Sequence, residues 1–248
     1  MRKPVVRICM SPAMYELYRQ ANGITVVVDI FRATSAICTA LQNGVTEVIP
    51  VASIHDAKRY SDDDDVIIAA ERGGEIVDGF VYGNSPLSYI NNKHIQGKTL
   101  VLTTTNGTQA IDAAKEDGEL VIGAFSNLSV LTKWLIEQNQ DVMLLCAGWK
   151  NRLNLEDSLF AGAVVDVLLN NGFEYDIDSD AAIISRLLYT TAKNDMLKFL
   201  ENSSHRNRLK NLNLENDVEY CLTLDTCNVV PKLAGGSLKN ALKVQISN

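Results

Sequence analysis

The sequence lacks the spacings that build disulfide, zinc or nucleophile–histidine sites. Its five cysteines are an odd number, no two are spaced C-x-x-C, and three lie in apolar runs. Free, buried thiols in a reducing compartment are therefore expected. The three histidines, His55, His94 and His205, stand outside the polar loops described below and are expected to be structural or solvated. A zinc site of Cys and His, or a catalytic triad, is not predicted.

The sequence also lacks a long apolar run and an excess of positive charge. No stretch approaches the ~18 apolar residues of a membrane span, and no apolar signal core follows the first four residues. Twenty-three Lys and Arg oppose thirty Asp and Glu, for a net charge of −7. A cytoplasmic protein that binds neither membrane nor nucleic acid is predicted. A homodimer is expected from base rates alone.

What the sequence does contain is a regular alternation of short apolar runs and helix-like patterns. This alternation predicts an α/β protein, layered α/β/α, with a mixed, largely parallel sheet. Strands are predicted at 24–30, 47–51, 66–70, 99–103, 120–124, 142–146 and 228–232. Helices are predicted at 33–42, 108–115, 128–138, 158–169, 181–192, 196–201 and 216–222. Asn43-Gly44 is a helix-ending signal for the first helix.

Two segments of the chain resemble each other. Residues 25–34 can be laid over residues 99–108, and the match continues through a helix, a glycine and a second strand. An internal duplication would give two similar α/β halves, 1–125 and 126–248, although any two β-α-β units share this pattern. In both copies a polar loop follows the carboxyl end of a strand, where open α/β sheets bind ligands. The active site is predicted at these ends or between the halves.

Four polar loops could carry chemistry. In the first, Asp29–Ser35, a strand-end carboxylate suits a hard cation or a phosphoryl group, and Arg32 suits a phosphate or carboxylate. The alternative is a helix cap with a salt bridge. The second loop, Glu71–Glu75, contains two adjacent glycines that permit close approach of a ligand, but it has no specific assignment by itself.

The third loop, Thr103–Thr108, places hydroxyls, an amide and a glycine before a helix, where an anion is favoured. It is not a Walker loop, and a plain polar turn is an equal alternative. The fourth loop ends in Glu156-Asp157, directly before a helix. These acids are either metal ligands or, for Asp157 especially, groups that offset the helix dipole.

Taken together, the loops carry a resemblance to a known family. The strings V-V-D-I-F-R-A-T, E-R-G-G-E, G-N-S-P, T-T-N-G-T, F-S-N, C-A-G and L-E-D occur in order between about Ile24 and Ala161. This set resembles the 2-phosphosulfolactate phosphatase family. The family's first motif is commonly D-x-L-R-A-T, and Phe31 replaces its apolar residue here. The resemblance implies a magnesium-dependent phosphatase that releases phosphate from 2-phospho-3-sulfolactate, a step toward coenzyme M.

The resemblance and the loop chemistry together predict the site. The expected catalytic residues are Asp29 and Arg32, and the expected Mg²⁺ ligands are Asp29, Glu75 and Asp157, with Glu71 and Glu156 as substitutes. Arg72 is expected to read the substrate's carboxylate or sulfonate. The expected substrate-binding residues are Thr34, Arg72, Asn84, Ser85, Thr105, Asn106, Gly107, Thr108 and Asn127. Attack by water or by Asp29 itself stays open, as does a non-catalytic sensor of a phosphorylated acid.

Overall fold

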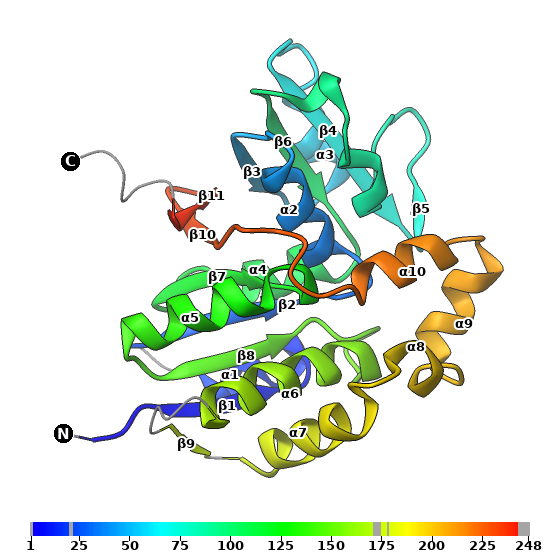
Figure 1. Ribbon diagram of the computed structural model, residues 1–248. Helices are drawn as coiled ribbons and strands as arrows, with labels where there is room; N and C mark the ends of the chain where they lie inside the picture. Colours follow the sequence, from blue (N-terminus) through cyan, green and yellow to red (C-terminus); the bar gives the residue numbers. More distant parts are fainter. Residues whose placement is uncertain (1, 20–21, 171–174, 178, 243–248) are drawn as a thin grey trace.

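One mixed sheet runs through the part of the chain that the computed structural model describes, which comprises residues 2–19, 22–170, 175–177 and 179–242. Its eleven strands lie in the order β5-β4-β6-β3-β11-β10-β7-β2-β8-β1-β9 (Figure 1). The strands are β1 Val5–Cys9, β2 Ile24–Val28, β3 Glu47–Pro50, β4 Val66–Arg72, β5 Glu75–Ile76, β6 Thr99–Thr103, β7 Glu119–Gly123, β8 Val142–Cys146, β9 Asp176–Ile177, β10 Pro231–Ala234 and β11 Ser237–Asn240.

The sheet consists of two parallel groups joined by a hairpin. β4, β6 and β3 are parallel, as are β7, β2, β8, β1 and β9. The antiparallel hairpin β10–β11 joins them through the pairs Lys232–Val121 and Leu238–Val48. β1 and β2 come before residue 125 and β8 comes after it, yet β1 and β2 both pair with β8. Strands from the two parts of the chain therefore alternate in one sheet. The division into two domains and the internal duplication stay predictions.

Helices cover both groups of strands. The helices of the first three quarters of the chain are α1 Tyr15–Tyr18, α2 Ala33–Gln42, α3 Ile54–Lys58, α4 Gly107–Ala114, α5 Leu128–Gln138, α6 Leu155–Asn170 and α7 Asp180–Ala192. Figure 1 shows α5, α6 and α7 over one face of the β7–β9 group. Every residue of β2 and β8 is buried, because these strands have neighbours on both sides and helices over the sheet.

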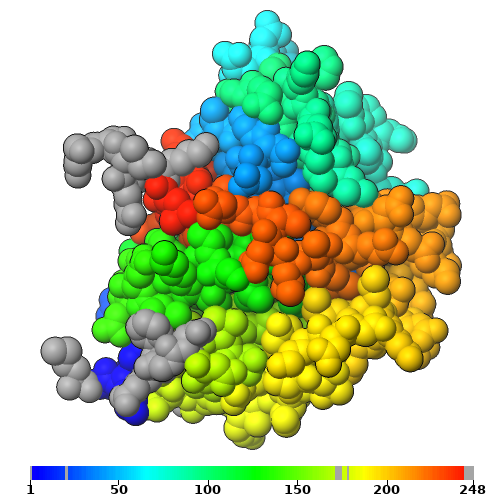
Figure 2. Space-filling model, in the orientation of Figure 1, coloured from blue at the N-terminus to red at the C-terminus, as the bar shows by residue number. Residues whose placement is uncertain are grey.

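A polar, helical segment follows α7 and crosses from one strand group to the other. It contains α8 Met196–Phe199, α9 Ser204–Asn211 and α10 Glu215–Cys221. Figure 2 shows the later part of this segment, in orange, between the blue and cyan upper part and the green and yellow lower part of the molecule. It therefore covers the region where the carboxyl ends of both parallel groups meet.

Most of the predicted elements are confirmed within a few residues at each end. The strands at 99–103 and 142–146 and the helices at 33–42 and 128–138 have the predicted bounds. The strand predicted at 228–232 is wrong in position, because β10 begins at Pro231. The sequence patterns missed β1, β5, β9, β11, α1 and α9.

Two expectations from composition can be compared with the structure. All five cysteines are buried and free, as expected. Among the described residues, no helix has the length and apolar character needed to cross a bilayer.

Candidate active site

Polar loops from both strand groups meet around one cavity of about 140 Å³. The loops follow the carboxyl ends of β2, β4, β6 and β8, and α9 closes one side. Its lining residues are Asp29, Phe31, Arg32, Glu71, Gly73, Gly74, Asn84, Thr105, Asn106, Trp149, Lys150, His205, Arg208 and Leu209. Segments far apart in the sequence thus converge where ligands of parallel sheets bind.

Asp29 occupies the turn between β2 and α2, and local bonds fix that turn. The backbone N–H of Asp29 donates to Thr34 Oγ1 at 3.0 Å, and Thr34 N–H donates back to the Asp29 carbonyl at 3.0 Å. Gly107, the first residue of α4, lies against the Asp29 side chain. A Cβ at position 107 would stand 2.8 Å from Asp29 Oδ2 and 2.4 Å from Ala33 Cβ. Only glycine allows α4 to approach Asp29 this closely.

The Asp29 carboxyl is surrounded by negative charge. Burial, followed by repulsion from Asp157, Glu71 and Glu156, raises the pKa of Asp29 well above its ordinary value. The backbone N–H of Ala33 opposes this shift only in part. A carboxylate held in this environment is stabilised by a bound cation, because the cation offsets the repulsion that raises its pKa.

Glu71 ties the end of β4 to the loop after β6. One carboxylate oxygen accepts from Gly74 N–H at 2.6 Å and from the Thr105 hydroxyl at 3.2 Å. The other accepts from Thr105 N–H at 3.1 Å. Glu71 is buried and its oxygens are occupied by these donors, so its role is to hold the Gly73-Gly74 turn and Thr105 together at the cavity wall.

Arg32 is a buried cation at the cavity wall and is held from two sides. One guanidinium nitrogen donates to Asp217 on α10 at 3.2 Å, and the other donates to the Gly74 carbonyl at 2.6 Å. Both charged side chains are less than a tenth exposed. Because the guanidinium has five N–H donors, Arg32 keeps donors beyond these two bonds. The arrangement fixes the guanidinium in place before any ligand arrives.

The opposite wall combines aromatic rings with cations. Trp149 stacks on the His205 ring, with centroids 5.9 Å apart and planes 10° apart. Lys150 Nζ lies 4.8 Å from the Trp149 ring centre and the Arg208 guanidinium 5.5 Å from it. Neither cation forms an ion pair with a carboxylate among the described residues. These two cations therefore offer their charge to whatever enters the cavity.

The three predicted magnesium ligands do not come together. Glu75 is exposed on β5 and is not part of the cavity wall. Asp157 is fully buried, and its oxygens accept from Ile30 N–H at 2.9 Å, Gly148 N–H at 3.0 Å and the Asn154 amide at 2.9 Å. Burial and the adjacent Glu156 raise the pKa of Asp157 to about 7 despite these donors. Asp157 thus connects the β2 turn to the loop after β8.

Two cavity-lining oxygens nevertheless suit a hard cation. No cluster of three or more His, Cys, Asp or Glu side chains able to hold a metal exists within the described residues. Magnesium, however, is usually held by one or two carboxylates and several waters. The Asp29 carboxyl is buried beside other carboxylates, which raise its pKa, and Asn84 Oδ1 is buried without a hydrogen-bond partner. Both side chains line the cavity.

Comparison with known proteins decides the family. The family model described as 2-phosphosulpholactate phosphatase matches residues 9–236. The chain belongs to the 2-phosphosulpholactate phosphatase family. A relative from Thermotoga maritima, named probable 2-phosphosulfolactate phosphatase, is 42% identical over 94% of this chain and 96% of its own length. Similarly named relatives from Caldanaerobacter subterraneus subsp. tengcongensis and Clostridium novyi are 35% and 37% identical, over 92% and 85% of this chain and 97% and 89% of their own.

In this 2-phosphosulpholactate phosphatase family member, five of the predicted site residues line the cavity. They are Asp29, Arg32, Asn84, Thr105 and Asn106. Gly107 stands directly against Asp29, as described above. The resemblance therefore led to residues that the fold brings together, and the first polar loop, at Asp29, meets the third polar loop, at Gly107.

Other predicted binding residues support the fold around the cavity. Thr34 is fully buried and bonds Asp29 N–H, and Thr108 exchanges hydrogen bonds with Thr104. The Asn127 side-chain oxygen accepts a hydrogen bond from Ala124 N–H, and its Nδ2 donates to the carbonyls of Ile122 and Val229. Ser85 is half-buried before the short helix Pro86–Tyr89 and does not line the cavity.

Arg72 lies in a neighbouring pocket rather than in the cavity. Its guanidinium donates to Thr103 Oγ1 at 3.0 Å and to the Glu71 carbonyl at 2.6 Å. The pocket is lined by Ala52, Arg72, Thr104, Thr105, Thr108, Gln109 and Asp112. Successive strand residues point to opposite sides, so Glu71 faces the cavity and Arg72 does not. Glu75 pairs with Arg72 across the β4–β5 hairpin and shares its side.

The sequence patterns missed one wall of the cavity. Trp149, Lys150, Arg208 and Asp217 had no assigned role, and His205, expected to be structural or solvated, is buried, pairs with Glu156 and also lines the cavity. α9 carries His205 and Arg208, and only His205 and Leu209 of its eight residues are buried. Such a polar helix gives no apolar periodicity to detect. The one available signal was the pair of adjacent aromatic and basic residues, Trp149-Lys150, directly after Gly148 in the loop that follows a strand.

Proposed function

We propose that this protein is a phosphatase that hydrolyses 2-phospho-3-sulfolactate, or a closely related 2-phosphorylated hydroxy acid, with magnesium as its cofactor. The observation that carries the proposal is the charge arrangement of the cavity. A buried carboxylate with a strongly raised pKa, Asp29, faces a fixed guanidinium, Arg32, and two cations without carboxylate partners, Lys150 and Arg208. The names of the relatives point to the same substrate class.

The phosphoryl group is proposed to bind between Arg32 and the start of α4. Asn106 and Thr105 line the cavity there, and α4 begins at Gly107. The Asn106 side chain makes no capping bond to the helix, although the Thr108 N–H donates to Thr104 Oγ1 at 3.2 Å. Free backbone N–H groups and the positive end of a helix dipole favour a phosphate. Arg32 adds a preorganised donor for the oxygens of the transferring group.

The second acidic group of the substrate is proposed to bind near Lys150 and Arg208. Both lie over the same tryptophan ring, so their charges are close together at one side of the cavity. A 2-phosphorylated hydroxy acid carries a carboxylate, and sulfolactate a sulfonate as well. Cations already placed for these groups reduce the cost of gathering several negative charges in a protein of net charge −7.

Magnesium is proposed to bind at Asp29, with Asn84 Oδ1 as a second oxygen. The ion would supply Lewis-acid stabilisation of charge on the phosphoryl oxygens. The protein's own contribution is to hold Asp29 buried at the turn after β2, where the Thr34 hydroxyl and Gly107 fix its backbone and surroundings. Attack by water or by the Asp29 carboxylate remains open in this proposal.

Phosphate release from a panel of phosphorylated acids tests the proposal. The panel contains 2-phospho-3-sulfolactate, 2-phospholactate and a simple alkyl phosphate, each with magnesium and with a chelator. We expect 2-phospho-3-sulfolactate to react fastest, and only with the metal. His55→Gln, at an exposed position of α3, is the control variant and should behave as the wild type. Tight binding of the panel without phosphate release would favour a sensor and overturn the proposal.

A further inference from the structure

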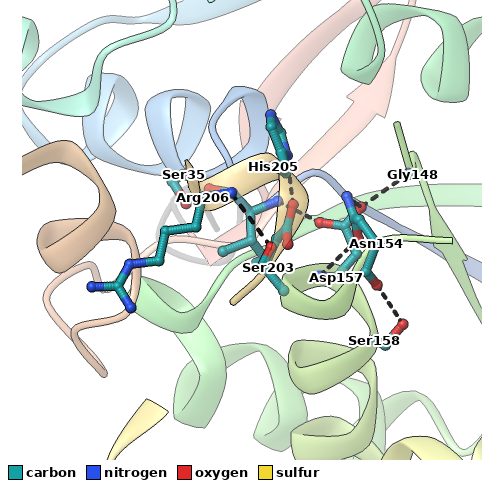
Figure 3. Close-up of polar contacts among 10 residues, drawn as sticks. Ser35, Gly148, Asn154, Asp157, Ser158, Ser203, His205 and Arg206 are labelled. Atoms are coloured by element: carbon teal, nitrogen blue, oxygen red, sulfur yellow. Dashed lines mark hydrogen bonds and ion pairs between the residues drawn. The ribbon is translucent and has the colours of Figure 1, made fainter. Parts of the chain in front are cut away.

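A buried carboxylate–imidazole pair borders the cavity and has no part in the roles above. Glu156, near the start of α6, is fully buried, and its Oε1 lies 2.6 Å from His205 Nδ1 on α9. Its other oxygen, Oε2, is buried without a hydrogen-bond partner. A carboxylate only accepts hydrogen bonds, so Nδ1 is the donor in this pair. Figure 3 shows His205 beside the start of α6, above Asn154 and Asp157.

The His205 ring has one defined orientation. Trp149 stacks on one face, and Phe31 approaches with ring centres 6.0 Å apart and planes at 64°. With Nδ1 fixed by Glu156, Nε2 is the ring's remaining polar atom. It makes no hydrogen bond within the described part of the chain, and the ring lines the cavity with Asp29 and Arg32. His205 therefore lines the ligand space with one ring nitrogen, Nε2, that is not used in a bond to the described part of the chain.

The proposed reaction has a requirement that this nitrogen meets. A phosphate ester of a hydroxy acid breaks at a bridging oxygen that is a poor leaving group, and charge builds on that oxygen in a loose transition state. Arginines cannot give up a proton. Glu71 accepts hydrogen bonds at both oxygens, and Lys150 is exposed. Asp29, as proposed, is committed to the cation.

We propose that His205 Nε2 gives its proton to the leaving oxygen and that Glu156 is the residue that positions the ring; this rests on the proposed function. The bond between phosphorus and the bridging oxygen breaks, its electron pair stays on that oxygen, and the Nε2 proton completes the hydroxyl group. Water supplies the oxygen that ends on phosphorus and releases one proton, which returns to Nε2. The sum is ester plus water giving hydroxy acid plus phosphate.

Glu156 acts through His205 rather than on the substrate. It does not line the cavity, and its bond to Nδ1 keeps that nitrogen protonated so that Nε2 is the exchanging atom. Its negative charge also balances the positive ring in the form that donates. Burying a carboxyl group without hydrogen bonds costs free energy of folding, and the bond from His205 Nδ1 to Oε1 offsets part of that cost.

Replacing the bridging oxygen of the substrate ester by sulfur distinguishes proton donation by His205 from any structural role of that residue. A thiolate leaves without a proton, so a proton donor matters for the oxygen ester and not for the sulfur ester of the same acid. We expect His205→Asn to lower kcat on the oxygen ester about 10²–10⁴-fold, the usual contribution of a general acid. On the sulfur ester, kcat of His205→Asn should differ from the wild-type value by less than about tenfold. For each of the two esters, KM of the variant should be similar to that of the wild type. Asn places an amide where Nδ1 lies, so the bond to Glu156 can persist while Nε2 is lost.

Glu156→Gln provides the second variant. It keeps an acceptor for Nδ1 but removes the charge, and we expect a smaller loss that is again confined to the oxygen ester. His55→Asn, on the exposed surface of α3, is the matched control and should leave both esters unaffected. Equal losses on the two esters in His205→Asn would overturn the proton-donor role. A wild-type protein inactive on both esters would instead sink the proposed function itself.

Discussion

Gly107 makes the closest contact between the two main site loops, and adding one methyl group there should damage both stability and turnover. In Gly107→Ala the new Cβ would lie 2.4 Å from Ala33 Cβ and 2.8 Å from Asp29 Oδ2. Carbon atoms pack at about 3.5–4.0 Å, so α2 or α4 must shift by roughly an ångström. Overpacking of this kind costs about 1–3 kcal/mol, and the better helix propensity of alanine returns at most about 1 kcal/mol.

The expected net loss of the free energy of unfolding in urea therefore lies between about 0 and 3 kcal/mol, with a central value of about 1–2 kcal/mol. For a chain of this size it corresponds to a fall in Tm of about 2–8 °C. Because Asp29 moves with the helix, kcat for phosphate release should fall up to about 10²-fold, the usual effect of a 1 Å misplacement.

A second substitution makes the prediction sharper. Ala33→Gly removes the nearer of the two obstructing atoms, so the double variant should recover part of the stability and activity lost by Gly107→Ala. If Gly107→Ala unfolds and turns over substrate like the wild type, the close approach of α4 to Asp29 is refuted. The same holds if Ala33→Gly brings no recovery, because the collision would then lie elsewhere.

Three further changes give separate results. Asp217→Ala leaves Arg32 buried without its charged partner, and the free energy of unfolding should fall by about 3–5 kcal/mol; a normal urea midpoint would contradict the pair seen at 3.2 Å. Asp157, with its pKa raised to about 7, binds its proton more tightly when folded. The free energy of unfolding should thus fall by up to about 4 kcal/mol between about pH 4 and pH 7. This decline should be smaller in Asp157→Asn, where Asp29, whose pKa is also raised, still contributes a part of it; an unchanged slope would refute it. Arg208→Gln should raise KM about tenfold or more for 2-phospho-3-sulfolactate but not for a simple alkyl phosphate, whereas Arg59→Gln, an exposed control, should change neither.

The sheet and its main helices were predictable because burial leaves a clear mark on the sequence. β2 and β8 are flanked on both sides, so each is a continuous apolar run, and α2 ends at the expected Asn43-Gly44, with Gly44 at φ +104°. The convergence of Asp29, Arg32 and Thr105 followed from a general property of parallel sheets, whose strand carboxyl ends share one edge.

The remaining features depend on contacts that local patterns do not contain. The direction of the side chains along β4 decides that Glu71, and not Arg72, faces the cavity. The two residues are adjacent in the sequence, so their positions in it do not distinguish which one faces the ligand. Asp157 is occupied by backbone donors from two other loops. The helix α9 is polar throughout except at Leu209, so its position over the cavity arises only from tertiary packing.

Replacing Asp29 by Asn tests the central claim most directly. The substitution removes a buried charge that three other carboxylates repel, so the protein should unfold at the same or a higher urea concentration than the wild type. Phosphate release from 2-phospho-3-sulfolactate in the presence of magnesium should nevertheless fall by about three orders of magnitude or more. Turnover within tenfold of the wild type, in a protein that is folded, would contradict the account.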